Sequence, residues 1–461
     1  MVNLKHLKIQ HLSTLGLILT GFLCMAIAHP NAAIAGPTNE NIEIESLLSP
    51  ADSRALAQAN QLIQEAIAFY QSGEFAQAVP LVQEALALEE SVLGADHLEV
   101  ANTLSNLSLL YESQGLYAEA LPPSERALQI REAQLEPTHP DIAFSLESLA
   151  GIYKAQGSYR AAQMLYERSH FIYEIAYGEN DLGIATSLNN LAGIYKLQGN
   201  YPAARPLYER TLSIYERELG PDHLNVAVAL NNLAGLYQSE GSYAEALPLF
   251  KRAIAIQTNA LTTYHPTVAN TLNNLAALYQ AQENYDDAEP LYQQALEIRQ
   301  ATLAENHPDI ASSLNNLAEL HHAEGNLDAA IPLHEQAYAI WAAAFGESHP
   351  DVATSLNNIA EVYKDQADYA LALSFHERAL TIREQTLGTA HPAVAFSLNN
   401  IASVYEEQGD EDTAIEFYDR ALDIVEVALG EAHPSTLIIA DNLNGLLRAG
   451  RIENDIQTDG L

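Results

Sequence analysis

The sequence has a single cysteine and few basic residues, and each shortage excludes a class of function. Cys24 lies in the N-terminal segment, so the rest of the chain has no thiol for a disulfide, a thiolate metal site or a nucleophile. Lysine and arginine number 21 against 60 acidic residues, which gives a formal charge of −39. A chain of that charge repels the phosphates of nucleic acid, so we expect no nucleic-acid partner.

The sequence also lacks the short motifs that mark the common catalytic sites. It has no phosphate-binding Gly-x-x-x-x-Gly-Lys-Ser/Thr loop and no Gly-x-Ser-x-Gly nucleophile elbow. Two His-Glu pairs, at 334 and 376, begin like metalloprotease helices, but Tyr338 and Leu380 stand where the second histidine is required. We therefore expect no catalytic residue, no metal site and no cofactor.

The first 35 residues differ in composition from the rest of the chain. Lys5 and Lys8 carry their only charges, and an uncharged apolar run extends from Leu12 to Ala28. The second of two Ala-x-Ala cleavage patterns follows at 33–35. We predict that residues 1–35 are a signal peptide, that the protein is exported to the periplasm or the cell exterior, and that no membrane insertion remains after cleavage. The alternative is an uncleaved membrane anchor, because the apolar run approaches the length of a membrane span.

A strict internal repeat organises the remaining chain. Positions 97, 139, 181, 223, 265, 307, 349, 391 and 433 are 42 residues apart, and all are histidine except Asp181. Counted from this position, Leu or Ile recurs at offset 10, Ala at 11 and Tyr at 14, which with an apolar residue at offset 7 forms one stripe of an α-helix. Proline often follows the histidine, as suits a helix start, so the histidine is interpreted as a cap or loop-packing residue. Uninterrupted units of this kind stack as a solenoid.

A second helix completes each unit. After a turn glycine such as Gly199, a second apolar pattern runs from Ala204 to Ile214. The small residues Ala192 and Ala204, together with Tyr195 and Gly199, resemble the tetratricopeptide repeat family. The 42-residue length, with HPDVATSLNNIAEVY at 349–363, is similar to the kinesin-light-chain subtype. The resemblance implies an all-α fold, a right-handed α-solenoid of tandem helix-turn-helix repeats whose concave groove binds peptides.

The repeats account for almost all of the chain after the signal peptide. We predict an acidic linker at 36–49, a solenoid at 50–449 with about nine helix pairs and a C-terminal capping helix, and a flexible tail at 450–461. The first helix is expected to begin at Pro50 with Ser49 as its cap. The last helix carries Asp441 and Asn444 at positions that are Asn and Ala in other repeats, which is typical of a polar end cap.

Offsets 5, 9, 12 and 16 of the first helix lie opposite its apolar stripe, and the resemblance implies that this side lines the groove. An amide both donates and accepts, so asparagines repeated at offset 9 can hydrogen-bond the backbone of an extended peptide. The alternative is that they bond neighbouring helices or face water; inter-repeat bonding is what we expect of the preceding asparagines at offset 8. The predicted peptide-binding asparagines are Asn106, Asn190, Asn232, Asn274, Asn316, Asn358 and Asn400.

The predicted groove changes character along the chain. Early positions are neutral or apolar, such as Gly193, Leu197 and Val228, whereas later positions are acidic. We expect the later half to favour a basic segment of a partner; the alternative is that the acids only solvate an exposed face. The acids predicted to contribute to binding are Glu319, Glu361, Asp365 and Glu407.

Together these features predict a non-enzymatic scaffold that binds an extended segment of a protein or peptide partner in its concave groove. Two alternatives stay open. The chain could be a structural or assembly factor that acts by end-to-end or convex-face contacts, or an accessory factor of an exported enzyme or polysaccharide pathway. The sequence does not indicate the oligomeric state.

Overall fold

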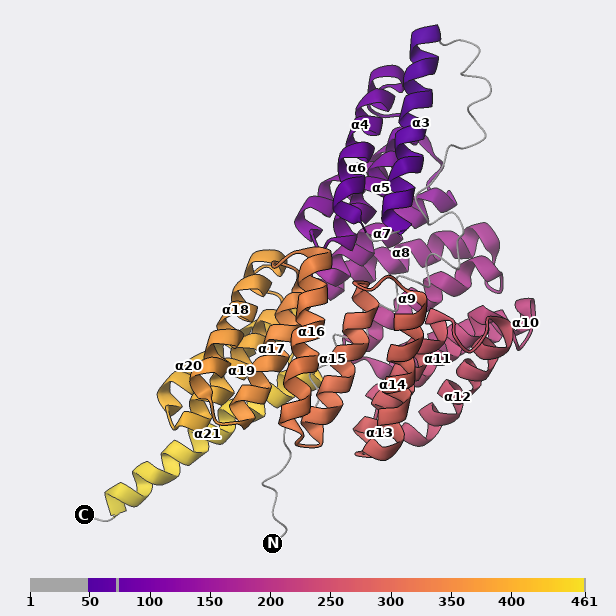
Figure 1. Cartoon of the computed structure of the whole chain (residues 1–461). Coiled ribbons are helices and arrows are strands. Elements are labelled where there is room, and N and C mark those ends of the chain that lie inside the picture. Colours follow the sequence, from indigo (N-terminus) through magenta and orange to yellow (C-terminus); the bar gives the residue numbers. More distant parts are fainter. Residues whose placement is uncertain (1–48, 72–73, 460–461) are drawn as a thin grey trace. The chain divides into compact units, whose positions relative to one another are not determined.

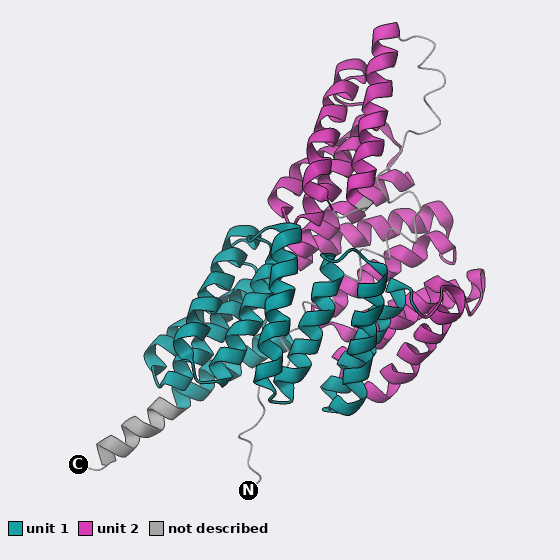
Figure 2. Cartoon of the chain, in the orientation of Figure 1, with its two compact units in different colours: residues 1–19, 264–461 teal, residues 20–263 magenta. Residues whose placement is uncertain are grey.

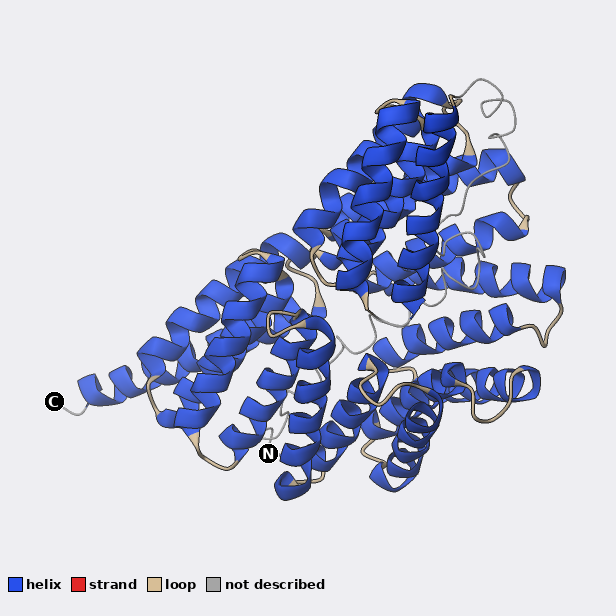
Figure 3. Cartoon of the chain, turned by 45° about the horizontal axis from the view of Figure 1, so that its top comes forward, coloured by secondary structure: helices blue, strands red, loops and turns tan. Residues whose placement is uncertain are grey.

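The computed structural model of the chain describes residues 49–71 and 74–459, and within those ranges it contains only helices joined by loops (Figure 1, Figure 3). The predicted all-α solenoid of tandem helix-turn-helix repeats is confirmed. The predicted signal peptide at 1–35 lies outside the described residues, as does the predicted linker apart from Ser49.

Each repeat consists of a first helix and a second helix that pack against one another. The first helices are α3 (Pro50–Gln71), α5 (Leu98–Ser113), α7 (Pro140–Ala155), α9 (Leu182–Leu197), α11 (Leu224–Ser239), α13 (Pro266–Ala281), α15 (Pro308–Ala323), α17 (Pro350–Asp365), α19 (Pro392–Gln408) and α21 (Pro434–Asp459). The second helices are α4 (Phe75–Leu93), α6 (Tyr117–Gln134), α8 (Tyr159–Tyr177), α10 (Tyr201–Leu219), α12 (Tyr243–Ala260), α14 (Tyr285–Thr302), α16 (Leu327–Phe345), α18 (Tyr369–Leu387) and α20 (Glu411–Leu429).

Within the described residues the chain divides into two compact units, the unit of residues 20–263 and the unit of residues 264–461 (Figure 2). In the described chain the first contains α3 to α12 and the second α13 to α21. The division falls in the loop after α12, where Thr262 has φ 132°. Thr262 occupies the repeat position held by Gly220 and Gly346, and a β-branched residue rarely adopts such a backbone conformation. The repeat pattern is therefore interrupted in this loop.

The recurrent histidine caps the first helix of its repeat. In the eight repeats that carry it, His Nδ1 accepts a hydrogen bond from the backbone N–H two residues later, at 2.9 to 3.2 Å. In α9 the Oδ1 atom of Asp181 accepts the same bond from Gly183 at 2.7 Å. The interpretation of the histidine as a cap is confirmed, and Asp181 departs from the repeat in residue type while keeping its role.

Small residues allow the two helices of a repeat to pack closely. Ala192 on α9 and Ala204 on α10 are fully buried, and they lie in one cluster with Tyr208, Leu233 and Leu236. Because α11 contributes the last two residues, the cluster joins one repeat to the next. Burial of such side chains removes apolar area from water at roughly 25 cal/mol per Å². The repeating core thus holds successive repeats in register.

Many of the scarce cations hold adjacent repeats together. In the unit of residues 20–263, an arginine of one second helix pairs with a glutamate of the preceding second helix. A different set of arginines, Arg131, Arg299 and Arg383, is buried and donates to a serine of the following first helix. The pairs between second helices, which are partly exposed, are Arg126–Glu90, Arg168–Glu132, Arg210–Glu174 and Arg252–Glu216, with N–O distances of 2.6, 2.6, 3.7 and 2.7 Å.

The repeat array begins where the sequence predicts, but its last helix ends later than predicted. Ser49 Oγ accepts a hydrogen bond from the backbone N–H of Asp52 at 3.2 Å, as expected of the cap of α3. The helix α21 continues to Asp459, so the predicted end near 449 is too early. Most of the segment predicted to be a flexible tail is therefore helical.

Candidate functional site

The first helices carry a polar face on the side opposite their apolar stripe. We define this polar face by offsets 5, 9, 12 and 16 of each first helix, together with offset 15, which lies at its edge toward the apolar stripe. In α17, Leu356, Ile359 and Ala360 are buried in the core, whereas Asn358 and Glu361 on the polar face are half-buried. The same spacing places polar side chains on α15 and α19 in the same unit. The polar face is therefore a surface built from successive repeats.

Asparagines of the polar face form hydrogen bonds between successive first helices. The Nδ2 atom at offset 9 donates to the Oδ1 atom at offset 8 of the preceding repeat. This is the inter-repeat bonding expected of offset 8. The peptide-binding role of offset 9 is not tested by these contacts and stays a prediction, since an amide keeps further donor and acceptor capacity. The bonded pairs are Asn232–Asn189 at 2.7 Å, Asn358–Asn315 at 3.0 Å and Asn442–Asn399 at 3.0 Å.

The other predicted asparagines differ in burial. Asn106 and Asn274 are buried, whereas Asn190, Asn316 and Asn400 are half-buried. Asn400 Oδ1 accepts a bond from Asn399, its neighbour in the sequence, at 3.3 Å. Within the described residues the side chain of Asn316 makes no hydrogen bond. Asn316 is consequently the member of the set whose amide has the most unused capacity.

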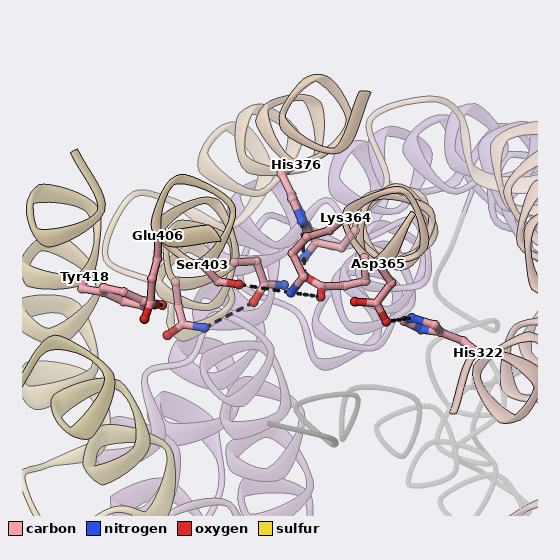
Figure 4. A network of polar contacts seen from close by, with 11 residues as sticks. His322, Lys364, Asp365, His376, Ser403, Glu406 and Tyr418 are labelled. Atoms are coloured by element: carbon pink, nitrogen blue, oxygen red, sulfur yellow. Dashed lines mark hydrogen bonds and ion pairs between the residues drawn. The ribbon is translucent and has the colours of Figure 1, made fainter. Parts of the chain in front are cut away.

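The acids of the later repeats belong to a polar network (Figure 4). Glu361 lies 2.6 Å from Lys364 Nζ and 3.3 Å from His376 Nε2. Lys364 also donates to Ser403 Oγ on the next first helix at 3.1 Å. Figure 4 shows Lys364 between Ser403 and Asp365, with Asp365 pointing toward His322. The network thus links α17 to α18 and to α19.

Glu361 and Lys364 stabilise one another in their charged forms. Burial opposes ionisation of Glu361, but Lys364 and His376 outweigh it and hold the pKa of this carboxyl far below its usual range. Burial likewise opposes protonation of Lys364, and Glu361 outweighs it, so the lysine pKa is raised. The charge of Glu361 is therefore compensated within the protein, which the sequence alone did not reveal.

The other predicted acids differ in exposure. Glu319 Oε1 accepts hydrogen bonds from Asn315 and Asn358, both at 2.8 Å. Asp365 is exposed, and its Oδ2 atom lies 3.0 Å from His322 Nε2. Glu407 is exposed on α19. Asp365 and Glu407 are thus the two predicted acids that a partner could reach most easily.

Two buried histidines beneath this surface were missed at the sequence level. His334 Nδ1 lies 3.0 Å from Asn315 Oδ1, and His376 Nδ1 lies 2.8 Å from Asn357 Oδ1. Burial, and then His322, lower the pKa of His334 to about 3, so this histidine is neutral. A signal was present: both occupy a position that is tyrosine in most other repeats, such as Tyr292.

In the unit of residues 20–263 lysines stand at offset 15, at the edge of the polar face, a position that the predicted groove did not include. Lys154 and Lys196 occupy the same repeat position as Lys364. Burial lowers the pKa of Lys196 to about 8. Its Nζ atom would lie 3.2 Å from a Cβ added at Gly235, so the amine rests over the backbone of α11. No ion pair of Lys196 is present within the described residues.

The described residues also bear on two other kinds of feature, a metal site and a membrane-spanning helix. The part of the chain described here has no cluster of three or more His, Cys, Asp or Glu side chains placed to hold a metal ion. In that same part, every helix is too short or too polar to cross a bilayer.

Comparison with known proteins identifies the repeat. The family model described as tetratricopeptide repeat matches residues 58–133, 117–175, 183–259, 267–343, 309–385, 351–426 and 393–453. No curated protein matches the chain. Among solved structures, the TPR-like repeats of a putative kinesin light chain from Podosopora anserina are 30% identical, over 44% of this chain and 97% of that chain, with a TM-score of 0.37.

Two further solved structures are similar to the chain at lower identity. BtubC (BKLC) from P. vanneervenii is 24% identical over 50% of this chain and 91% of that chain, with a TM-score of 0.40. Rap protein, in a complex with Competence and Sporulation Factor, is 17% identical over 82% of this chain and 99% of that chain, with a TM-score of 0.52, which shows the common fold. Because the family model covers most of the chain in register with the observed helix pairs, the chain belongs to the tetratricopeptide repeat family.

Proposed function

We propose that the protein is a non-enzymatic scaffold that holds an extended segment of a partner protein along the polar face of its first helices. Tetratricopeptide repeats generally mediate protein–protein interaction. The observation that carries the proposal is the polar face itself, where half-buried amides and charges recur at one repeat position after another. Amides such as Asn316 have unused donors and acceptors, which suit the regularly spaced backbone groups of an extended peptide.

The unit of residues 264–461 would favour a basic segment. Asp365 and Glu407 are exposed at the same offset of successive first helices, whereas Glu361 is half-buried beside Lys364. All three carboxylates contribute to raising the pKa of Lys364. A lysine or arginine of the partner would therefore meet Asp365 and Glu407 rather than Glu361. Complementary charges at the rim of a binding surface raise the association rate and the specificity more than the affinity. Cleavage of the predicted signal peptide would place this surface outside the cytoplasm.

Selection from a random peptide library tests both parts of the proposal. The purified chain would be panned against displayed 12-residue peptides, in parallel with D365N/E407Q and with N316A. The matched control is E335Q/E377Q, which removes the same charge from exposed positions of the second helices α16 and α18.

We expect the wild type to select peptides enriched in Lys and Arg. D365N/E407Q should lose that enrichment, and E335Q/E377Q should keep it. N316A should weaken the selected peptides by about fivefold, since one amide hydrogen bond contributes about 1 kcal/mol. Failure of the wild type to select any peptide would refute the scaffold proposal. Selected peptides without basic enrichment would refute only the charge preference.

A further inference from the structure

The second helix α8 carries an exposed apolar stripe. Met164, Phe171 and Ile175 are 65%, 59% and 53% exposed, and spacings of seven and four residues place them on one side of the helix. The opposite side of α8 is buried in the unit through Ala162, Tyr166 and other residues. Large apolar side chains gathered on one exposed face of a soluble protein typically mark an interaction site.

The stripe is not a feature of the repeat. The repeat positions of Met164, Phe171 and Ile175 are occupied in the next three repeats by proline, by small or charged residues, and by polar residues or alanine. The helix α8 thus differs from the next three second helices at all three positions. Because those helices form without large apolar residues there, the fold does not require such residues in α8. The equivalent residues are Pro206, Pro248 and Pro290, then Ser213, Ala255 and Glu297, and then Arg217, Asn259 and Ala301.

The charges around the stripe favour a second copy of the same chain. The formal charge of the whole chain is −39, so most faces of two copies repel one another. The helix α8 instead has two arginines and two glutamates and no net charge. Arg160 lies at its start and Glu179 just after its end; both side chains are exposed, and neither makes an ion pair within the described residues. One end of the stripe is therefore basic and the other acidic.

We propose that two copies of the chain associate through α8, packed antiparallel about a two-fold axis that passes between residues 169 and 170. Under that symmetry residue i faces residue 339 − i of the partner copy. Met164 then meets Ile175 of the other copy, and Arg160 meets its Glu179. Phe171 meets Arg168 of the other copy, whose guanidinium can pack over the aromatic ring. The apolar contacts and the charge pairs are satisfied by one register, which is what an isologous interface requires.

The size of the stripe sets the expected affinity. Residues 160 and 175 are about 22 Å apart along the helix. Stable dimers bury roughly 800 Å² on each partner, more than three side chains and two flanking charges of one helix provide. We therefore expect a dimer with a dissociation constant in the micromolar range.

Sedimentation equilibrium of the full chain between about 1 and 200 μM tests the proposal. I175E places a charge against Met164 of the other copy, twice in each dimer, and should weaken dimerisation by at least about 100-fold. The matched control is V427E. Val427 is 87% exposed on α20 and occupies the same repeat position as Ile175, so the substitution has the same chemistry away from α8. V427E should dimerise like the wild type.

Charge reversal tests the register. R160E should weaken the dimer by about tenfold, and R160E/E179R should restore it to within about threefold of the wild type, because the pair is re-formed with exchanged signs. Far-ultraviolet circular dichroism checks that each variant keeps its helices. A wild type that stays monomeric at 200 μM, or an I175E variant that dimerises like the wild type, would overturn the proposal. Failure of R160E/E179R to recover would overturn the antiparallel register.

Discussion

The same repeat position carries Lys364 in one unit and Lys196 in the other, and we predict that replacing them by methionine has opposite effects on stability. Lys364 forms an ion pair with Glu361 at 2.6 Å, and the two side chains are 13% and 27% exposed. Removing one partner of a fully buried ion pair costs about 3–5 kcal/mol. Because Glu361 is partly exposed and keeps His376 at 3.3 Å, we expect K364M to lower the free energy of unfolding by about 2 kcal/mol.

Lys196 has no anionic partner within the described residues, so its burial is a cost. Burial lowers its pKa from an ordinary value of 10.5 to about 8. That difference corresponds to at most about 3 kcal/mol of destabilisation at neutral pH, where the lysine is still charged. K196M should therefore be neutral or stabilising. Between pH 8 and 10.5 the unfolded state binds the proton more tightly than the folded state, so stabilisation by K196M should shrink as the pH rises.

Hydrogen exchange followed by mass spectrometry measures the two effects separately in the intact chain. Repeat proteins open locally, and exchange reports the opening free energy of each helix. We expect faster exchange of α17 and α19 in K364M, and unchanged or slower exchange of α9 and α11 in K196M. Equal destabilisation by the two substitutions would refute the reasoning, because it would mean that the ion pair with Glu361 contributes nothing.

Three further predictions concern single side chains. N358A removes the donor of two hydrogen bonds and should cost about 1–3 kcal/mol in urea denaturation, whereas N316A should cost less than about 0.5 kcal/mol. T262G should stabilise its loop by about 1 kcal/mol, because glycine adopts φ 132° without strain; an unchanged midpoint would contradict this. As the pH falls, His334 is protonated in the unfolded state near its ordinary pKa of 6.5, but in the folded state only near pH 3. The free energy of unfolding should therefore fall below about pH 6.5, by at most about 5 kcal/mol, and H334Y should remove that loss in an acid titration.

The repeat and its helices could be predicted from the sequence because they depend on local spacing. The apolar stripe, the small residues Ala192 and Ala204, and the histidine next to proline each occur within one helix or at its start. Asp181 shows why the cap was predictable even where the residue changes, since a carboxylate accepts the same backbone hydrogen bond.

The environment of the polar face could not be predicted because it depends on contacts between repeats. The partner of Asn358 is 43 residues away, and the partners of Lys364 lie on its own helix and on the following helices. Lys196 has the same repeat position as Lys364 but rests over Gly235, where no acceptor side chain exists. Helical periodicity places these side chains on one face, but only the neighbouring helices decide which of their charges are compensated.

The α8 stripe and the polar face lie on different helices of a repeat, so association through α8 leaves the polar face of the first helices available to a partner. A dimer would then present two binding surfaces, and a partner displayed at high density would be held by both. Linked binding of this kind raises the apparent affinity by about 10²–10⁴-fold when both sites can be reached. Wild type and I175E should bind a selected peptide equally at low surface density, and only the wild type should dissociate more slowly as the density rises. If the wild type and I175E dissociate at the same rate at every density, linked binding is refuted, and peptide binding does not depend on the dimer.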